Sequence, residues 1–168
     1  MDLINNLAEL ALATRLKRLS ERLSGDVNKI YKESEVDFES KWYLVLELLN
    51  REKTMAITDI ANSLKLSHPA IVQFANQLIK KKLIKASSDK KDGRKRMVSL
   101  TNNGKSILVK ISPILESIKE ENKKWLDSGN ANLLQILNEL ELALDEQSMY
   151  QRVKTNILQK KISNLSIS

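Results

Sequence analysis

The chain has 168 residues, of which 42% are apolar and 29% are charged, and its formal net charge is +7. This length fits one domain or a small module with helical arms, and the apolar fraction can build a core. Cysteine is absent and His68 is the only histidine, which excludes disulfides, thiolate zinc sites and thiol redox sensing and disfavours a transition-metal site.

The first thirty or so residues predict one long amphipathic helix. Its apolar positions recur at steps of three and four residues from Leu12 to Ile30, and an offset leucine stripe precedes them. A second amphipathic helix follows Asp37, carries Trp42 and ends near Arg51. We expect the aromatic residues of this second helix to hold the central part of the chain against the terminal arms.

Two short helices joined by a tight turn come next. Thr58 is expected to cap the first helix, and Asp59 lies in its first turn, where the helix dipole favours an acid. The turn is expected to bury Leu66 and to present Ser67 as the cap of the second helix. Pro69 suits the first turn of that helix, because this position needs no amide donor.

The second of these helices predicts an inward apolar face and an outward polar face. Gln and Asn side chains can bind adenine edges in a DNA major groove, a Val methyl can meet a thymine methyl, and a helix N-terminus can hold a phosphate. The residues expected to bind DNA from this helix are Ser67, His68, Pro69, Val72, Gln73, Asn76 and Lys80. The alternative is that they form only the solvated face of a core helix.

A strand, a basic tip and a second strand follow, around a turn at Asp92-Gly93. Arg94 is expected to enter a minor groove, because that narrow negative channel favours a guanidinium, while Lys95 and Arg96 hold phosphates. The alternative for this charge run is a solvated loop.

Positive charge is concentrated in the same region. Between Lys65 and Arg96 there are ten basic residues and two acids, Asp89 and Asp92, a balance of +8. The whole chain carries +7, so the rest of the chain sums to −1. A basic balance confined to a helix-turn-helix and its wing is the electrostatic footprint of a phosphate backbone, and double-stranded DNA is therefore the expected partner.

The sequence after Thr101 is helical again. One helix runs towards Trp125, a break follows at 128–130, a leucine stripe extends from Leu133 to Leu144, and a basic tail begins at Met149. The apolar faces of the first and last helices are wider than the remaining chain can cover, which predicts a homodimer. The alternative is that each stripe is ordinary intramolecular core.

The expected fold is therefore mainly α: a winged helix-turn-helix with a small two-stranded β wing, flanked by N- and C-terminal dimerisation helices. The expected division is residues 36–101 for the DNA-binding domain and residues 1–35 with 102–168 for the dimerisation region.

Other functional classes find no support in the sequence. The four glycines lie too far apart for a P-loop or a dinucleotide-binding loop, and no nucleophilic triad is present. We therefore expect a non-enzyme without a cofactor. No apolar run reaches the roughly eighteen residues of a membrane span, and Asp2 and Glu9 stand where a signal peptide would be basic. The protein is expected to be cytoplasmic, with no membrane partner.

The segment from Thr58 to Gln73, the run 81–84 and the segment from Asp92 to Gly104 together resemble the MarR (multiple antibiotic resistance regulator) family of bacterial winged-helix transcription factors. The resemblance covers residues 3–146. Residues 10–20 and 36–42 look like the subgroup that is often fused to a GNAT-type acetyltransferase. We expect no acetyltransferase activity, because the chain ends at Ser168 before any such domain.

The resemblance implies a triangular homodimer, made by N- and C-terminal helices, that binds a pseudo-palindromic promoter site and often releases it on binding a small molecule. We expect the protein to act as a repressor. It assigns the recognition helix to residues 67–81 and the wing to residues 89–96. Lys82 stands where the family usually has glycine, so a left-handed conformation there either costs about 1 kcal/mol or is avoided by another backbone path.

A candidate effector pocket lies between the second helix and the dimerisation helices, with Tyr31, Trp42, Tyr43 and Trp125 as its expected residues. Aromatic side chains at such a junction are alternatively simple packing. Two rival functions remain open: a winged-helix protein-interaction or regulatory module without sequence-specific DNA binding, and a residual acyl transferase. The basic window argues against the first, and the missing glycine-rich loop against the second.

Overall fold

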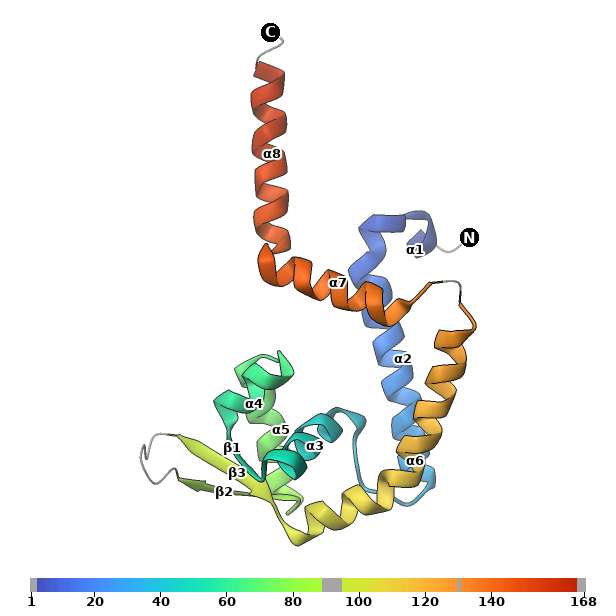
Figure 1. Cartoon of the computed structure of the whole chain (residues 1–168), viewed down its shortest axis with the longest axis vertical. Helices are drawn as coiled ribbons and strands as arrows, with labels where there is room; N and C mark the ends of the chain where they lie inside the picture. Colours follow the sequence, from blue (N-terminus) through green and yellow to red (C-terminus); the bar gives the residue numbers. More distant parts are fainter. Residues whose placement is uncertain (1–2, 89–94, 130, 166–168) are drawn as a thin grey trace. The chain divides into compact units, whose positions relative to one another are not determined.

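The computed structural model describes residues 3–88, 95–129 and 131–165, the last five of these as backbone only, and its contacts divide the chain into two units, Met1–Ile118 and Lys119–Ser168. The described chain is mainly helical with one small antiparallel sheet (Figure 1). Its helices are α1 (Leu3–Asn6), η1 (Ala8–Ala11), α2 (Leu12–Glu33), η2 (Ser40–Trp42), α3 (Tyr43–Glu52), α4 (Ile57–Leu64), α5 (His68–Lys80), α6 (Asn102–Asp127), α7 (Leu133–Glu146) and α8 (Met149–Leu165).

The N-terminal segment is not the single helix that the apolar pattern predicts. Ala8 has φ 44°, a left-handed conformation that an L-residue adopts only at a cost, and it begins the 3₁₀ turn η1 that follows α1. The long helix α2 begins only at Leu12 and keeps the expected apolar stripe as far as Ile30. The prediction of one continuous helix from the apolar periodicity is therefore confirmed for α2 and wrong for the residues before it.

The sheet has three strands, β1 (Thr54–Ala56), β2 (Ile84–Ser88) and β3 (Arg96–Leu100), in the order β1-β3-β2. Both outer strands pair antiparallel to β3, and Val98 lies opposite Met55 on one side and Ala86 on the other. The expected two-stranded wing of β2 and β3 is confirmed, and a third strand, β1, which was not predicted, joins the same sheet. A strand of three residues such as β1 is too short to show alternation in the sequence.

The core of the first unit lies between the helix-turn-helix, α3, the sheet and the start of α6. Leu46, Ile60, Ile71, Leu78 and Val98 are 0% exposed. Burial of a side chain of this size contributes about 1.5 to 3 kcal/mol relative to exposure. These residues come from α3, α4, α5 and β3, so the same core fixes the position of α5 against the wing.

The entry to the helix-turn-helix differs from the sequence prediction. Helix α4 begins at Ile57, and its cap position is Ala56, which makes no side-chain capping bond, so Thr58 is not the cap. The reason is that β1 runs directly into α4. Leu66 is 40% exposed, so the expectation that the turn buries it is wrong, whereas Asp59 does lie in the first turn.

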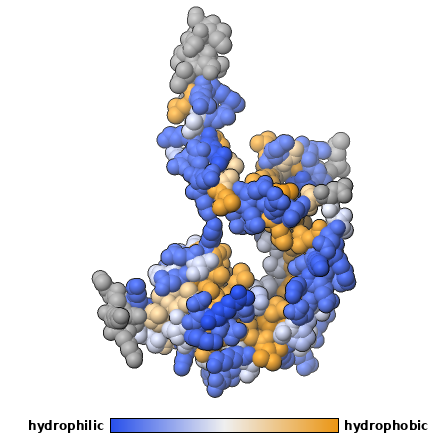
Figure 2. Space-filling view, in the orientation of Figure 1, coloured by the Kyte–Doolittle hydropathy of each residue, from blue (hydrophilic) through white to orange (hydrophobic). Residues whose placement is uncertain are grey.

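The second unit contains the end of α6, then α7 and α8. The expected break falls after Asp127, and α7 is capped by Asn132, whose Oδ1 accepts a bond from the Gln135 amide at 3.1 Å. No described side chain of α7 is buried, and Figure 2 shows apolar patches on the surface of these helices. In the described residues no helix is both long enough and apolar enough to span a bilayer.

Candidate nucleic-acid interface

Helix α5 begins as the sequence predicts. The Ser67 hydroxyl accepts a bond from the Ala70 amide at 3.4 Å, and Pro69 lies in the first turn. Ser67, His68 and Pro69 are all exposed. The positive end of the helix dipole and its first amide groups are thus open to an anion from outside.

The two faces of α5 differ as a groove-binding helix requires. Ile71, Ala75 and Leu78 are buried in the core. Gln73, Asn76 and Lys80 lie on the other side of the helix and are all exposed. Val72 is only partly exposed and packs against the core, so it lies at the edge of the outward face. The surface open to a partner is therefore polar and basic.

A hydrogen bond joins α5 to the wing. Arg96, the first residue of β3, donates from Nη1 to Asn76 Oδ1 at 2.9 Å, and both side chains are exposed. Asn76 keeps its two amide hydrogens and a second lone pair for another partner. Lys95 is also exposed beside this pair, whereas Arg94 and the rest of residues 89–94 lie outside the described residues.

Lys82 adopts the left-handed conformation that a glycine would take. Its φ is 58°, its amide donates to the Ile79 carbonyl at 2.9 Å, and the next amide, of Leu83, donates to the Leu78 carbonyl at 2.9 Å. The backbone thus ends α5 and enters β2 by the path open to glycine, at a cost of about 1 to 2 kcal/mol for a residue with a Cβ.

The Thr101 hydroxyl ties this corner to the start of α6. It lies 2.7 Å from the Lys82 carbonyl oxygen and 3.0 Å from that of Leu83, and it accepts a bond from the Gly104 amide at 3.0 Å. A Cβ at Gly104 would lie only 2.1 Å from the Leu83 carbonyl oxygen. Glycine at 104 therefore lets α6 approach the corner that sets the angle between α5 and the wing.

A contact that sequence reasoning missed fixes the other end of α5. Trp42 is 2% exposed, and its indole nitrogen donates to Gln77 Oε1 at 2.9 Å. The amines of Lys41 and Lys81 each lie 5.7 Å from its ring, and Lys81 also pairs with Asp37. Nothing in the sequence indicates that Gln77 bonds to Trp42, because the two residues lie far apart in the chain.

Aromatic residues expected at an effector pocket mostly pack with one another. Tyr31 is 1% exposed and meets Phe38 edge to face at 5.4 Å, and Phe38 meets Trp42 in the same way at 5.7 Å. Burial raises the pKa of Tyr31 and of the partly buried Tyr43. Trp125 is 62% exposed and belongs to the second unit, so the grouping of all four residues stays a prediction.

An open hollow of about 460 Å³ lies beside Trp42, at the C-terminal end of α5. Its lining contains charges of both signs. The residues that line it are Asp37, Glu39, Trp42, Gln77, Lys80 and Lys81. Among the described residues, no group of three histidine, aspartate or glutamate side chains is placed to hold a metal ion.

Comparison with solved structures finds the same fold in MarR regulators. A MarR mutant from E. coli complexed with operator DNA has a TM-score of 0.67 at 16% identity, covering 86% of this chain and 99% of that one. PcaV from Streptomyces coelicolor, in complex with its natural ligand, has a TM-score of 0.64 at 19% identity, covering 88% and 97%. MepR of S. aureus, in complex with DNA, has a TM-score of 0.64 at 18% identity, covering 80% and 97%.

The comparison of sequences points the same way. No curated protein matches the chain. The model of the MarR family matches residues 36–95, which run from just before α3 to the start of the wing's second strand. The winged helix-turn-helix segment of this chain is therefore similar to the MarR family, and the described chain has the fold of the MarR regulators compared above.

Proposed function

We propose that this protein is a dimeric DNA-binding transcriptional regulator of the MarR type, acting as a repressor on a pseudo-palindromic operator. Residues 36–101 form the DNA-binding domain, and residues 1–35 with 102–168 form the dimerisation region. Each α5 enters one major-groove half-site, the half-sites lie about one helical turn apart, and the wings reach the flanking minor grooves. Arg94 is the residue proposed for the minor groove.

One observation carries this proposal: the outward face of α5 and the basic first residue of β3 form one joined surface. The Arg96–Asn76 bond connects them. Gln73 and Lys80 are exposed on α5, and Lys95 is exposed directly before β3. The structures of E. coli MarR with operator DNA and of S. aureus MepR with DNA have the same fold. The side chains open on this surface are those that read base edges and neutralise phosphates.

The proposal extends to a non-enzymatic protein that works beside the DNA in the cytoplasm. The matched family and the fold are those of transcriptional regulators, and this favours a binding role over catalysis. No described observation favours a winged-helix module that binds only protein. That rival predicts little DNA affinity, so the first experiment separates the two functions.

The experiment is a fluorescence-anisotropy titration of duplex DNA from upstream of the protein's own gene, at several salt concentrations. Gln73→Ala should weaken binding by about 1 to 3 kcal/mol, mainly for one base position, because a base-edge contact is lost. Lys95→Ala should weaken binding to all sequences and reduce the salt slope by about one unit. Lys123→Ala, an exposed lysine of the second unit, is the matched control.

Equal binding curves for the native chain, Gln73→Ala and Lys95→Ala would show that the outward face of α5 and the start of β3 are not the DNA-binding surface. No salt-dependent binding to any duplex would remove the regulator proposal altogether.

We further propose that a small molecule modulates DNA binding, as the ligand complex of PcaV suggests for a protein of this fold. The candidate residues are Tyr31, Trp42, Tyr43 and Trp125. Because Trp42 and Trp125 are the only tryptophans, intrinsic fluorescence reports on this group directly. A phenolic or acyl ligand that binds there should quench the emission and lower DNA affinity, and Trp42→Phe should remove part of the quenching. Quenching without any change in DNA affinity would contradict the regulatory role.

A further inference from the structure

Helix α8 presents an apolar face that remains exposed in the part of the chain that the structure describes. Tyr150 is 71% exposed, Val153 47% and Ile157 49%. Steps of three and four residues place them on one side of the helix. Together with their neighbours they line a shallow hollow of about 510 Å³, bounded by Met149, Tyr150, Val153, Lys154, Ile157 and Leu158. An exposed apolar patch of this kind is typical of a surface that has a partner.

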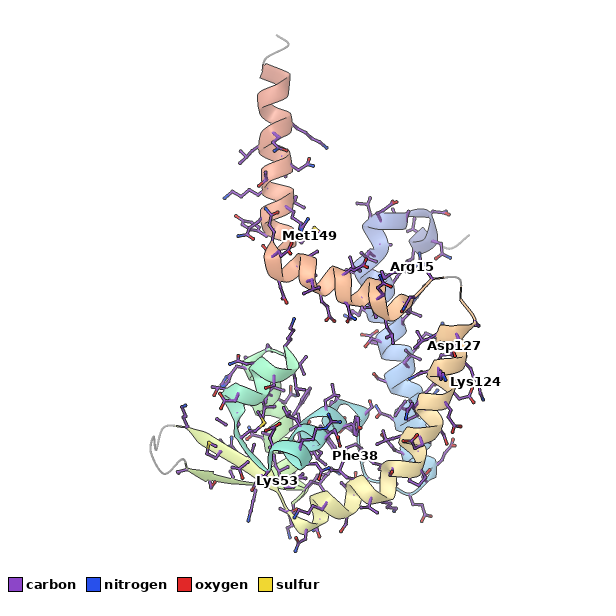
Figure 3. All side chains as sticks on the ribbon, viewed as in Figure 1. Arg15, Phe38, Lys53, Lys124, Asp127 and Met149 are labelled. Atoms are coloured by element: carbon purple, nitrogen blue, oxygen red, sulfur yellow. The ribbon has the colours of Figure 1, made fainter. Side chains whose placement is uncertain are left out.

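Hydrogen bonds fix the corner at which α8 leaves α7. Arg152 donates from Nε to the Gln147 carbonyl and from Nη2 to the Ala143 carbonyl, each at 3.0 Å. The Ser148 hydroxyl accepts from the Gln151 amide at 3.3 Å, and Gln151 Oε1 accepts from the Ser148 amide at 3.0 Å. These bonds satisfy some of the free backbone groups at the end of α7 and the start of α8. From Met149 onward α8 therefore extends away from α7 as an arm (Figures 1 and 3).

Helix α7 has an exposed apolar stripe of its own. Leu133, Ile136, Leu140 and Leu144 repeat at steps of three and four residues and are 39% to 50% exposed. Its charged residues are all acidic and flank this stripe on both sides: Glu139, Glu141, Asp145 and Glu146.

The charges of α8 are opposite to those of α7. Its charged residues are all basic: Arg152, Lys154, Lys160 and Lys161. The four acids give α7 a charge of −4, and the four basic residues give α8 a charge of +4. Each of these helices also has an apolar face to bury. The fixed corner keeps the two helices of one chain apart, so the matching surfaces are open to those of another chain.

We propose that α8 of one protomer packs on α7 of a second copy, and that the exchange is reciprocal. The inference rests on the homodimer of the proposed function and adds an interface to it. A two-fold arrangement buries both apolar faces of both chains and pairs their charges at once. A lipid surface could take a basic amphipathic helix, but the acidic complement is present in the chain itself and favours a second copy.

Cysteine cross-linking tests the contact, because the native chain contains no cysteine. In the full chain, Ile157→Cys combined with Leu140→Cys should give a covalent dimer on mild oxidation, seen on a non-reducing gel, since a disulfide forms only between closely apposed residues. Thr155→Cys combined with Leu142→Cys is the matched control, because these positions lie on the opposite faces of the same helices. A disulfide within one chain, or equal dimer yields from both pairs, would overturn the proposal.

Charge reversal tests the complementarity. In the cross-linking background, Lys154→Glu with Lys160→Glu should lower the dimer yield about tenfold, because acids would then face acids. Adding Glu139→Lys with Glu141→Lys should restore it. Thr155→Glu adds a negative charge on the other face of α8 and should leave the yield unchanged. Circular dichroism verifies that each variant is folded, and failure of the double reversal to restore the yield counts against the pairing.

Three further measurements separate this inference from the proposed function. If the native chain sediments as a dimer and binds duplex DNA, but the variant with cysteines in place of Leu140 and Ile157 gives no cross-link, only the exchanged arms are overturned. A chain that sediments as a monomer overturns the dimer and the arms together. Binding to phosphatidylserine vesicles that is lost in Lys154→Glu, with no cross-link in solution, assigns α8 to a lipid surface instead.

Discussion

The backbone angle φ of Lys82 sets the path by which the chain leaves α5 and enters the wing strand β2. Its φ of 58° carries a strain of about 1 to 2 kcal/mol that glycine would not have, while glycine adds about 0.5 to 1 kcal/mol of freedom to the unfolded chain. Lys82→Gly should therefore raise the free energy of unfolding by about 0.5 to 1 kcal/mol, measured by urea denaturation. Lys80→Gly, in helical backbone, should lower it by about 1 kcal/mol. A loss of stability in Lys82→Gly would contradict the strain.

Tyr31 links burial to pH dependence. Burial raises its pKa above the ordinary value of 10.0, so the folded state retains the phenol proton where the unfolded state has lost it. Its contribution is complete below pH 10 and is lost as the pH rises through the folded-state pKa. As the pH rises above 10.0, the free energy of unfolding of the native chain should therefore fall more steeply than that of Tyr31→Phe, as urea titrations between about pH 8 and about pH 11 would measure. Tyr150→Phe, at an exposed ring, controls for loss of a phenol. Parallel curves for the native chain and Tyr31→Phe would exclude this role.

Among the elements, the start of α6 and the corner before β2 depend on one another through Gly104. A Cβ there would lie 2.1 Å from the Leu83 carbonyl oxygen, a clash with backbone that only a shift of α6 or β2 can relieve. Gly104→Ala should lower the free energy of unfolding by about 1 to 3 kcal/mol and weaken DNA binding. Gly25→Ala, in α2 with nothing within 4 Å, should instead raise stability by about 1 kcal/mol. Thermal unfolding of both variants gives the comparison, and equal signs would contradict the role of Gly104.

The elements also show what a sequence can predict. Period and capping located α5, Ser67 and the strands β2 and β3, because each depends on neighbours within one turn or one strand. The three residues of β1 and the break at Ala8 left no periodic signal. The Arg96–Asn76 and Trp42–Gln77 bonds join residues 20 and 35 positions apart, so they follow from the tertiary fold and not from local pattern.

For the whole molecule, the exposed apolar stripe of α2 links the stability of the fold to dimer formation. Leu12, Leu16, Leu19 and Leu23 are 42% to 53% exposed in the single chain. If a second chain covers them, as proposed, the midpoint of thermal unfolding should rise with protein concentration, because association stabilises only the folded state. Leu19→Glu should abolish that dependence, while Thr14→Glu, on the opposite face of α2, should keep it. Because one protomer reads only one half-site, the Leu19→Glu variant should also lose about half of the salt slope of operator binding. Diluting the native chain about a hundredfold changes the stabilisation by association by about 2.7 kcal/mol. A midpoint of thermal unfolding that does not change over this dilution would show that these leucines stay uncovered.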